Sequence, residues 1–419
     1  MIDVRRFVLD VSPLRTSRDF RYLFIARVVS ILGLGILAVT VPLQTFRLTG
    51  STTHVALVAT ILGLATFLGT FAGGVLADRF DRRVVIALAR GTVGVMFTLL
   101  AVNAMLPEPQ LWVIYLCAAV DGFCGGVSAT ALMAVTPTLV PRDKLPAAGA
   151  LMALTADVGS MVGPALGGIV IAAGNFATAY GCAAITTFVT TFCITRLPAL
   201  PPTHAATDSP LRSIASGIRY AFGNTIIGGV LVAGFVTMIL AGWAVLIPEY
   251  ATTVLGVGST AVGLLYAAPA VGAALGSLSS GWTSSLRRVG LAIFIAMFVS
   301  AAGLVGAGAG SVLTLALICL AAHGFGDAVA DIVRYATVQK HTPDEMRGRV
   351  AGVWSAQVTA GASVGSMIAG VVAFLVPVDY ALLIYGLTGL VATTILTLAL
   401  PTLRRFSEPV ATPDGHSYS

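Results

Sequence analysis

Charged side chains are scarce in this chain. Asp, Glu, Lys and Arg together make up 10% of its 419 residues, while hydrophobic residues make up 57%. The mean hydropathy is +0.93, and a single core cannot hide so much apolar surface from water. The composition therefore excludes a water-soluble domain and predicts a surface that faces lipid.

Cysteine is also rare, and its spacing shows no ligand pattern. The five cysteines are Cys117, Cys124, Cys182, Cys193 and Cys319. None belongs to a close Cys-x-x-Cys or Cys/His pattern, so we expect packing residues rather than metal ligands. The sequence also lacks the His-Glu-x-x-His motif or nucleophile and base pair that a membrane-embedded enzyme would need. We therefore expect no enzymatic activity, no cofactor and no metal site.

Long apolar runs dominate what is present. A membrane-spanning helix needs about 20 mostly apolar residues, and such runs recur from Val28 to Leu400 between short segments that carry Pro, Gly or charge. The pattern predicts an all-α membrane protein with twelve transmembrane helices. We place these spans at residues 21–46, 54–77, 84–106, 111–135, 147–173, 176–196, 226–248, 258–282, 289–308, 311–334, 350–376 and 379–400.

Basic residues fall on one side of this topology. If the N-terminal tail, residues 1–20, is cytoplasmic, nearly all Lys and Arg in the connections face the cytoplasm and Arg47 is left outside. This asymmetry is the positive-inside signal, and it predicts an inner-membrane protein with both termini in the cytoplasm. The tail precedes no small-residue cleavage site, so we expect the first span to be retained. Anionic lipids account for the net charge of +6, and no nucleic-acid partner is expected.

The longest polar interruption divides the spans six and six. It covers residues 197–225 and is rich in proline. We expect a cytoplasmic linker here, since the segment is too short for a soluble signalling domain. The linker would separate an N-terminal bundle at 21–196 from a C-terminal bundle at 226–400, which a cytoplasmic tail at 401–419 follows.

The two halves also resemble each other. An offset of 202 residues aligns Gly122 with Gly324, Gly159 with Gly361 and Gly163 with Gly365. A duplicated six-helix half explains this coincidence. Transporters built from such repeats form two pseudo-symmetric bundles and bind substrate where the halves meet.

The connection after the second span carries a recognisable motif. Residues 74–83 read Gly-Val-Leu-Ala-Asp-Arg-Phe-Asp-Arg-Arg, which resembles the loop signature G-x-L-a-D-r-x-G-r-k of the major facilitator superfamily. Asp78 lies at a helix end, where it can pair with Arg79 or Arg82 as a latch that holds the cytoplasmic side shut. Asp81 stands where the family usually has Gly. The alternative is a solvated loop whose arginines only orient the chain.

The 147–173 span carries a second motif. Residues 159–168 resemble the antiporter motif G-x-x-x-G-P-x-x-G-G of drug-exporting members of that superfamily, which favours export over uptake. Such a glycine stripe lets a neighbouring helix approach closely, and a proline bends the helix. General small-residue packing is the alternative reading. The residues concerned are Gly159, Gly163, Pro164, Gly167 and Gly168.

Ionisable residues inside the spans are functional candidates, since burying them in a bilayer is costly. The 311–334 span contains His323, Asp327, Asp331 and Arg334. Steps of four, four and three residues keep these side chains on one narrow helical face, which we expect to line the transport cavity. Asp331, the acid nearest Arg334, is the expected ion-pair partner of that arginine.

Three more candidates lie in the N-terminal half. The repeat aligns Asp121 with His323, so an acid and an imidazole can approach one pathway from the two halves. Asp157 lies two residues before Gly159 and is expected to face the cavity rather than the glycine stripe. Arg27, early in the first span, is the expected counter-ion.

Proton coupling requires a carboxylate that loads and releases a proton near neutral pH, which desolvation and a nearby base or cation make possible. Asp121 and Asp327 are the first candidates for this role. Each acid can instead belong to a structural ion pair. His323 can titrate in the working range, or serve as a hydrogen-bonded packing residue.

Aromatic side chains at mid-span positions can stack on a flat ligand, although such residues also face lipid or pack in cores. As candidates for the substrate cavity we select Phe123, Trp243, Tyr266, Phe325 and Trp354, together with Gln357.

Almost the whole chain resembles the enterobactin exporter family of the major facilitator superfamily. The resemblance implies proton-driven export of an iron-free, aromatic siderophore by a protein whose partners are this substrate, protons and membrane lipids, and which we expect to be a monomer. A proton-driven multidrug or antibiotic antiporter would share the same motifs and stays an alternative. An uptake symporter is disfavoured by the Gly-Pro motif. The resemblance rests on residues 24–27, 73–79, 88–92, 106–109, 121–123, 197–202 and 348–357.

Overall fold

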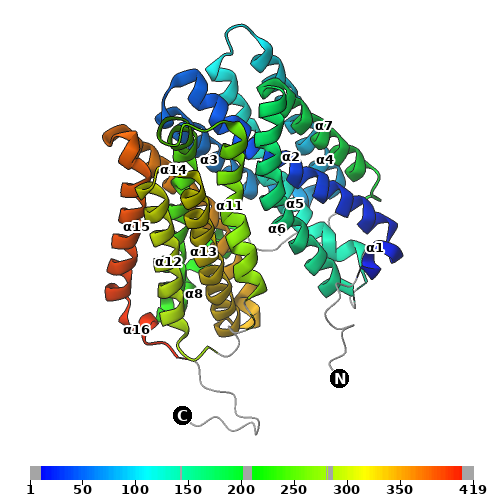
Figure 1. Cartoon of the computed structure of the whole chain (residues 1–419). Helices are drawn as coiled ribbons and strands as arrows, with labels where there is room; N and C mark the ends of the chain where they lie inside the picture. The colour runs from blue at the N-terminus through cyan, green and yellow to red at the C-terminus, as the bar shows by residue number, and fades with distance from the viewer. Residues whose placement is uncertain (1–10, 142–143, 202–209, 280, 282–285, 408–419) are drawn as a thin grey trace, which may run out of the picture. The chain divides into compact units, whose positions relative to one another are not determined.

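The computed structural model describes residues 11–141, 144–201, 210–279, 281 and 286–407. Within these residues, twelve helices are long and apolar enough to cross a membrane, which confirms the predicted fold class (Figure 1). The chain forms two compact units. Unit 1 is drawn from Met1–Thr207 and Gly258–Ala267, and unit 2 from Asp208–Val257 and Ala268–Ser419.

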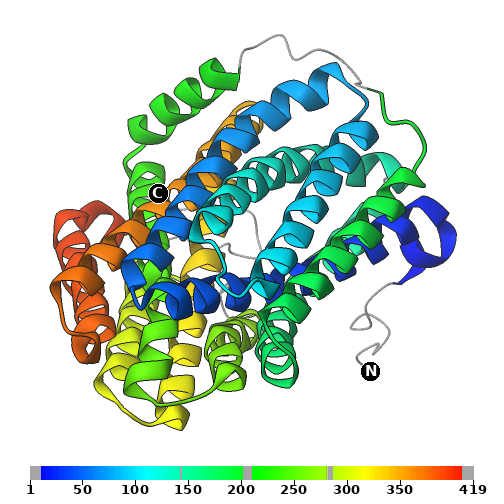
Figure 2. The same cartoon turned by 90° about the horizontal axis from the view of Figure 1, so that it is seen from above.

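Unit 1 is built from the first six long helices and a short leading one. Figures 1 and 2 show these helices, coloured blue to green, lying beside one another. They are α1 (Ser12–Thr16), α2 (Arg18–Thr49), α3 (Thr52–Arg79), α4 (Arg82–Met105), α5 (Leu111–Leu139), α6 (Leu145–Ala173) and α7 (Phe176–Thr195).

Unit 2 holds the remaining helices, although the first half of α11 (Ser259–Leu278) groups with unit 1. The unit also contains α8 (Pro210–Gly223), α9 (Thr225–Leu240), η3 (Ala241–Leu246), α10 (Ile247–Glu249), η4 (Tyr250–Val254), α12 (Val289–Ala309), α13 (Leu313–His341), α14 (Asp344–Leu375), α15 (Val378–Ala399) and α16 (Pro401–Arg404).

Capping residues, rather than hydropathy, set the helix ends. Helix α2 begins before the expected start at residue 21, because the side chain of Ser17 accepts a hydrogen bond from the Phe20 N–H at 3.1 Å. It ends at Gly50, whose φ of 61° is left-handed and whose N–H donates to the Phe46 carbonyl at 2.7 Å. The helix therefore extends past its apolar stretch at both ends.

The two units repeat the same internal packing. In unit 1 the first span packs on the fifth (α2 on α6), the second on the fourth (α3 on α5) and the third on the sixth (α4 on α7). In unit 2, α9 packs on α14 and α12 on α15, and Gly324 of α13 lies against the Pro269 carbonyl of α11. These are the equivalent pairs of the second half. The aligned glycines thus mark duplicated helix contacts.

The seventh span is interrupted, which the sequence did not predict. Helix α9 passes into the 3₁₀ segment η3, the single turn α10 and the π-helical η4 before the span ends at Val254. The Tyr385 hydroxyl is within hydrogen-bonding distance of two backbone carbonyls. It lies 2.5 Å from the Ile239 oxygen and 3.2 Å from the Gly365 oxygen, and both oxygens act as acceptors. A side chain at Gly242 would collide with the backbone of Gly365. Close approach of α14 and α15 therefore accompanies the change of helix type.

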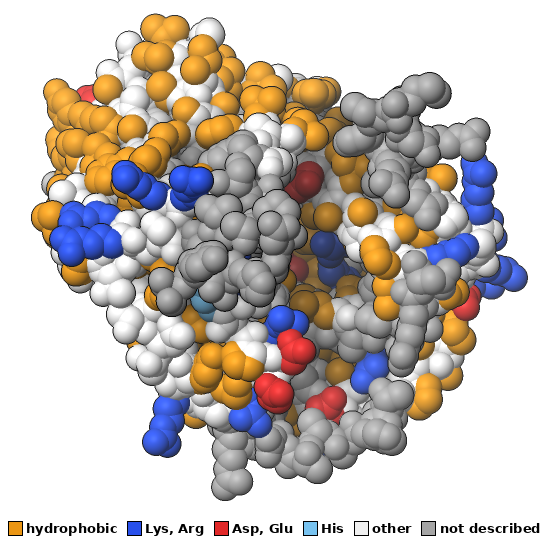
Figure 3. All heavy atoms as spheres, turned by 90° about the horizontal axis from the view of Figure 1, so that it is seen from below, with side chains coloured by type: hydrophobic (Ala, Val, Ile, Leu, Met, Phe, Trp, Pro, Cys, Tyr) orange, Lys and Arg blue, Asp and Glu red, His pale blue; other side chains and the backbone are white. Residues whose placement is uncertain are grey.

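Large apolar side chains cover much of the outer surface of the helices. Leu278 is 86% exposed, Phe374 77% and Met105 75%. Such exposure is unfavourable in water but suits hydrocarbon. Figure 3 shows one face of the molecule, on which Lys and Arg side chains lie among apolar ones. The chain is thus a polytopic membrane protein.

Candidate functional site

Helix α13 brings buried polar residues to one face within unit 2. His323, Asp327 and Arg334 lie on this helix, and Gln357 lies on the neighbouring α14. We call these four residues the C-terminal polar cluster. His323 is 4% exposed and Arg334 is completely buried, in a part of the chain that is otherwise apolar. The cost of burying such groups requires that their contacts be accounted for one by one.

Arg334 makes the ion pair that the sequence predicts. Its Nη2 donates to Asp331 Oδ1 one turn earlier, and its guanidinium lies 5.4 Å from the centre of the Trp354 ring. Its Nη1, by contrast, is buried without a hydrogen-bond partner among the described residues. Gln357 Nε2 is also buried and also has no hydrogen-bond partner among the described residues. A Cβ at Gly234 of α9 would collide with both nitrogens, so a side chain there would require the ends of Arg334 and Gln357 to shift.

Asp327 also has an acceptor that is unpaired among the described residues, the buried Oδ1. The carboxyl group lies within electrostatic range of His323 and Arg334. An unpaired oxygen in an apolar interior is costly, and it can take up a proton without breaking an existing hydrogen bond.

His323 is held by hydrogen bonds and packing. Its Nδ1 lies 3.1 Å from the Ser300 carbonyl and 2.9 Å from the Ser300 hydroxyl. A carbonyl oxygen can only accept, so Nδ1 carries the proton in this contact. Trp243, which is 7% exposed, packs edge-to-face on the imidazole at 5.7 Å. These contacts favour the packing interpretation of His323, and they bury an aromatic ring that the sequence suggested for substrate stacking.

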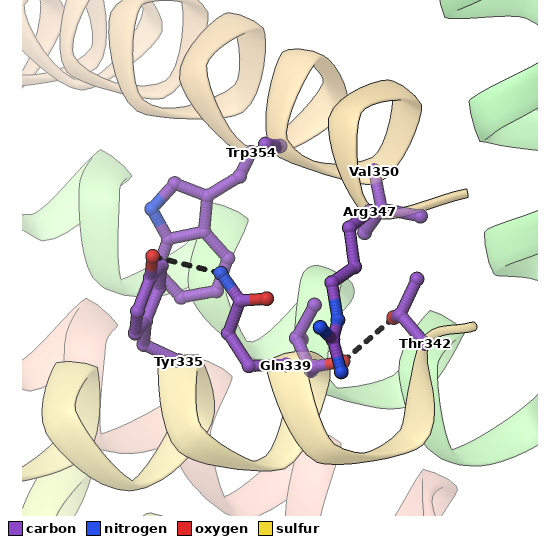
Figure 4. Close-up of a pocket in the computed structure, with 8 residues that line it drawn as sticks. Tyr335, Gln339, Thr342, Arg347, Val350 and Trp354 are labelled. Atoms are coloured by element: carbon purple, nitrogen blue, oxygen red, sulfur yellow. Dashed lines mark hydrogen bonds between the residues drawn. The ribbon is translucent and has the colours of Figure 1, made fainter. Parts of the chain in front are cut away.

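Trp354 is likewise engaged within the protein. The Trp354 ring lies between Arg334 and Tyr335, and the ring centres of Trp354 and Tyr335 are 5.8 Å apart. Trp354 also lines a cavity between α13 and α14 (Figure 4). The Tyr335 hydroxyl accepts a hydrogen bond from Gln339 Nε2 at 2.8 Å there. The cavity has a volume of about 20 Å³, which is room for a water molecule but not for a transported solute.

Unit 1 contains a second polar site, which we call the arginine cavity. Arg27 of α2 and Arg90 of α4 line this cavity of about 440 Å³, together with residues of α5, α6 and α7. Arg90 Nε donates to Ser128 Oγ at 3.0 Å, and Arg90 lies within electrostatic range of Asp121 and of Arg27. Arg27 is exposed. Sequence reasoning missed Arg90, although its place inside the 84–106 span was a sufficient signal.

The other predicted cavity residues are separated among helices of both units. Asp157 is exposed on α6, and Phe123 on α5 is 42% exposed. Tyr266 on α11 and Phe325 on α13 are partly buried. Their roles stay predictions.

The loop after α3 is held by hydrogen bonds of Asp81 as well as by the Arg82 N–H, which donates to the Leu200 carbonyl at 3.1 Å. The Asp81 carboxylate accepts hydrogen bonds from the backbone N–H of Arg83 at 2.9 Å and of Leu200 at 3.2 Å. It thereby caps α4 and fastens the segment that follows α7. Asp78 is partly buried and Arg79 is exposed, and their latch with Arg82 stays a prediction. Asp81, where the family pattern has Gly, thus has a structural role of its own.

The glycine stripe of α6 is a helix-packing surface. A Cβ at Gly163 would lie 2.7 Å from the Gly35 Cα of α2, and one at Gly167 would lie 2.9 Å from the Ile36 carbonyl. Gly159 lies against Ile31 of the same helix α2. Pro164 is buried inside α6, and Gly168 lies against Gly263, in the part of α11 that groups with unit 1. The stripe thus joins α6 to α2 at backbone contact.

In the part of the chain that the structure describes, twelve apolar spans form two similarly packed units, each with charges held inside its helices. This arrangement defines a membrane transporter of the major facilitator type. The chain belongs to the transmembrane secretion effector family, whose model matches residues 9–413.

Known proteins support this assignment. The chain is 40% identical over 410 residues to the enterobactin exporter EntS of Citrobacter koseri, covering 98% of each chain. It is 40% identical over 403 residues to EntS of Shigella boydii, covering 96% of each. Among solved structures, the nucleoside transporter NupG has a TM-score of 0.73 at 14% identity and covers 93% of this chain and 100% of its own. The human organic anion transporter MFSD10 has a TM-score of 0.63 at 15% identity, and the match covers 90% of this chain and 99% of MFSD10. These two structures support the fold alone.

Proposed function

We propose that this transporter exports an iron-free catecholate siderophore across the cytoplasmic membrane, driven by protons that move inwards. The observation that carries the proposal is the 40% identity to enterobactin exporters over 98% of both chains, because such coverage includes every span and connection. Both termini would lie in the cytoplasm, as the basic connections indicate. The transporter would act as a monomer.

The C-terminal polar cluster supports coupling to protons. Asp327 offers a buried oxygen that has no hydrogen-bond partner in the described part of the chain, and the buried Arg334 lies within its electrostatic range. Protonation of Asp327 would cancel one charge of this group and leave the pair of Arg334 with Asp331 in place. The charge of the cluster would then differ between the loaded and unloaded transporter, which is the requirement for coupling.

The packing inside each unit supports transport by alternating access. Glycine contacts such as Gly163 with Gly35 in unit 1 and Gly365 with Ile239 in unit 2 bring helix backbones together. Backbone contact of this kind makes each bundle stiff, so that motion takes place between bundles rather than within them.

The test compares siderophore retention in cells with and without the gene. Cells that make a labelled catecholate siderophore should accumulate it when the gene is deleted and release it again when the gene is restored. In inverted vesicles, uptake of the siderophore should depend on an imposed pH difference and stop with an uncoupler. Equal secretion by deletion and parent strains that have no other exporter would refute the proposal. Resistance to unrelated drugs without siderophore release would favour a multidrug antiporter instead.

A further inference from the structure

The arginine cavity places two cations inside the membrane-spanning part of unit 1. Arg27 is nine residues after the start of α2 at Arg18, and Arg90 is eight residues after the start of α4 at Arg82. At a rise of 1.5 Å per residue, both lie about 12 to 14 Å along their helices. This is too deep for their charges to be explained as topological signals at the membrane surface.

Their charge is only partly balanced within the protein. Arg90 lies in electrostatic range of one acid, Asp121, and of the like charge of Arg27. Its one hydrogen bond to a side chain among the described residues goes to the neutral Ser128. Two neighbouring cations, of which Arg90 is the one in range of an acid, attract a ligand with electron-rich oxygens. A guanidinium binds two adjacent oxygens at once through its parallel N–H groups.

The rest of the lining suits an aromatic ring. Met133 and Met152 contribute thioethers, and Ser30 and Thr190 contribute small hydroxyls. Thioethers make favourable contacts with aromatic rings, and guanidinium planes also stack on them. Met133 is 77% exposed, so the cavity is reachable from outside the helix bundle. Its volume of about 440 Å³ lies in the range of small-molecule sites, about 300–1,000 Å³.

We propose that the arginine cavity binds a catechol ring of the exported siderophore, with Arg27 and Arg90 donating hydrogen bonds to its two adjacent oxygens. This inference rests on the proposed function and adds the place of recognition. The same donors would also bind the phosphate of an anionic lipid, and the experiment separates these two sources.

The experiment measures binding of small probes to the purified full-length chain in nanodiscs of phosphatidylcholine. The probes are 2,3-dihydroxybenzoate, its 2,3-dimethoxy derivative and benzoate. Only the dihydroxy compound should bind well. Arg27→Gln and Arg90→Gln should each weaken its binding by about 10- to 100-fold, as expected for lost hydrogen bonds to a charged group. Arg21→Gln is the matched control, because Arg21 is exposed on the same helix outside the cavity and should leave binding unchanged.

Four outcomes would overturn the proposal. The first is wild-type affinity in both cavity variants, and the second is equal binding of the dimethoxy compound. The third is equal binding of benzoate, which would show that the carboxylate alone is recognised. The fourth is competition by added phosphatidylglycerol that disappears in Arg27→Gln, which would identify a lipid site. Arg90 contacts Ser128 and its variant can misfold. Arg27, which is exposed, therefore decides the test, with a single symmetrical gel-filtration peak as the criterion of folding.

Transport separates this inference from the proposed function. If the wild-type gene does not restore siderophore release in deletion cells, the proposed function fails. If it does restore release, and Arg27→Gln and Arg90→Gln restore it equally well with unchanged probe binding, the cavity assignment alone fails.

Discussion

The fully buried guanidinium of Arg334 is ion-paired with the carboxylate of Asp331, whose side chain is 41% exposed. The pair therefore joins the interior of α13 to its surface. One face of Arg334 is covered by Trp354, and Asp327 lies within electrostatic range of the buried end. Under the proposed mechanism, Arg334 keeps its charge while Asp327 gains and loses a proton.

Replacing Asp331 should leave the charge of Arg334 without its ion-pair partner. We expect Asp331→Asn to lower the free energy of unfolding by about 1–2 kcal/mol, less than for a fully buried pair because water reaches Asp331. Thermal unfolding in detergent measures this change. Asp344→Asn is the control, since the pair of Asp344 with Arg347 at 2.7 Å is largely exposed and its loss should leave the unfolding temperature almost unchanged. Equal effects of the two variants would contradict the assignment.

Asp327 should be needed for coupling but not for folding. Asp327→Asn keeps the size of the side chain and fixes it in a neutral state, so we expect the variant to fold and to lose pH-driven transport. Siderophore uptake into inverted vesicles with and without a pH difference measures this. Asp379→Asn, at the exposed start of α15, should keep full transport. Undiminished pH-driven uptake by Asp327→Asn would remove the acid from the mechanism.

A side chain at Gly234 should disturb the polar cluster more than the fold. A methyl group there would displace Arg334 Nη1 and Gln357 Nε2, which are the ends of flexible side chains, so we expect Gly234→Ala to reduce transport and to cost no more than about 1 kcal/mol of stability. Gly348→Ala is the matched control. Gly348 lies inside α14 with open space around it, and alanine should be neutral or stabilise that helix. Wild-type transport by Gly234→Ala would show that the two nitrogens have room to move.

The contact of Gly163 with Gly35 should be equally sensitive. We expect Gly163→Val to separate α6 from α2 and to lower the unfolding temperature, because the added carbons would overlap the backbone of α2. Gly149→Ala, in the same helix but with open space around it, should behave like the wild type. Circular dichroism during heating and gel filtration give the comparison. If Gly163→Val is as stable as Gly149→Ala, the stripe is not a packing surface.

Much of the fold could be predicted because its signals are local. Apolar length located the spans, and the spacing of three residues between Asp331 and Arg334 was enough to predict their ion pair. The aligned glycines Gly163 and Gly365 likewise indicated the repeat. Helix ends were less accurate, because Gly50 ends α2 through a backbone conformation that hydropathy does not describe.

The candidate site was predicted less completely. Arg90 was overlooked in the arginine cavity, and nothing in the sequence pairs His323 with Ser300 or Gly234 with Gln357. Trp243 and Trp354 were candidates for the substrate cavity, and the structure packs the first on His323 and the second on Arg334; their role towards substrate stays a prediction. Each of these contacts joins different helices, and a pattern read along one helix does not show which neighbour it meets.

The order of amino acids was enough to predict two related halves, and the described residues contain the expected twelve helices that are long and apolar enough to cross a membrane. Lipid imposes the length and composition of each span whatever its neighbours are. Which polar groups are paired and which are left without a partner depends instead on how the helices pack. Helix packing sets the distance between side chains that lie far apart in the chain. For a charge inside a membrane, a short distance to an opposite charge gives a structural ion pair, whereas a longer distance leaves the group able to bind a proton or a ligand.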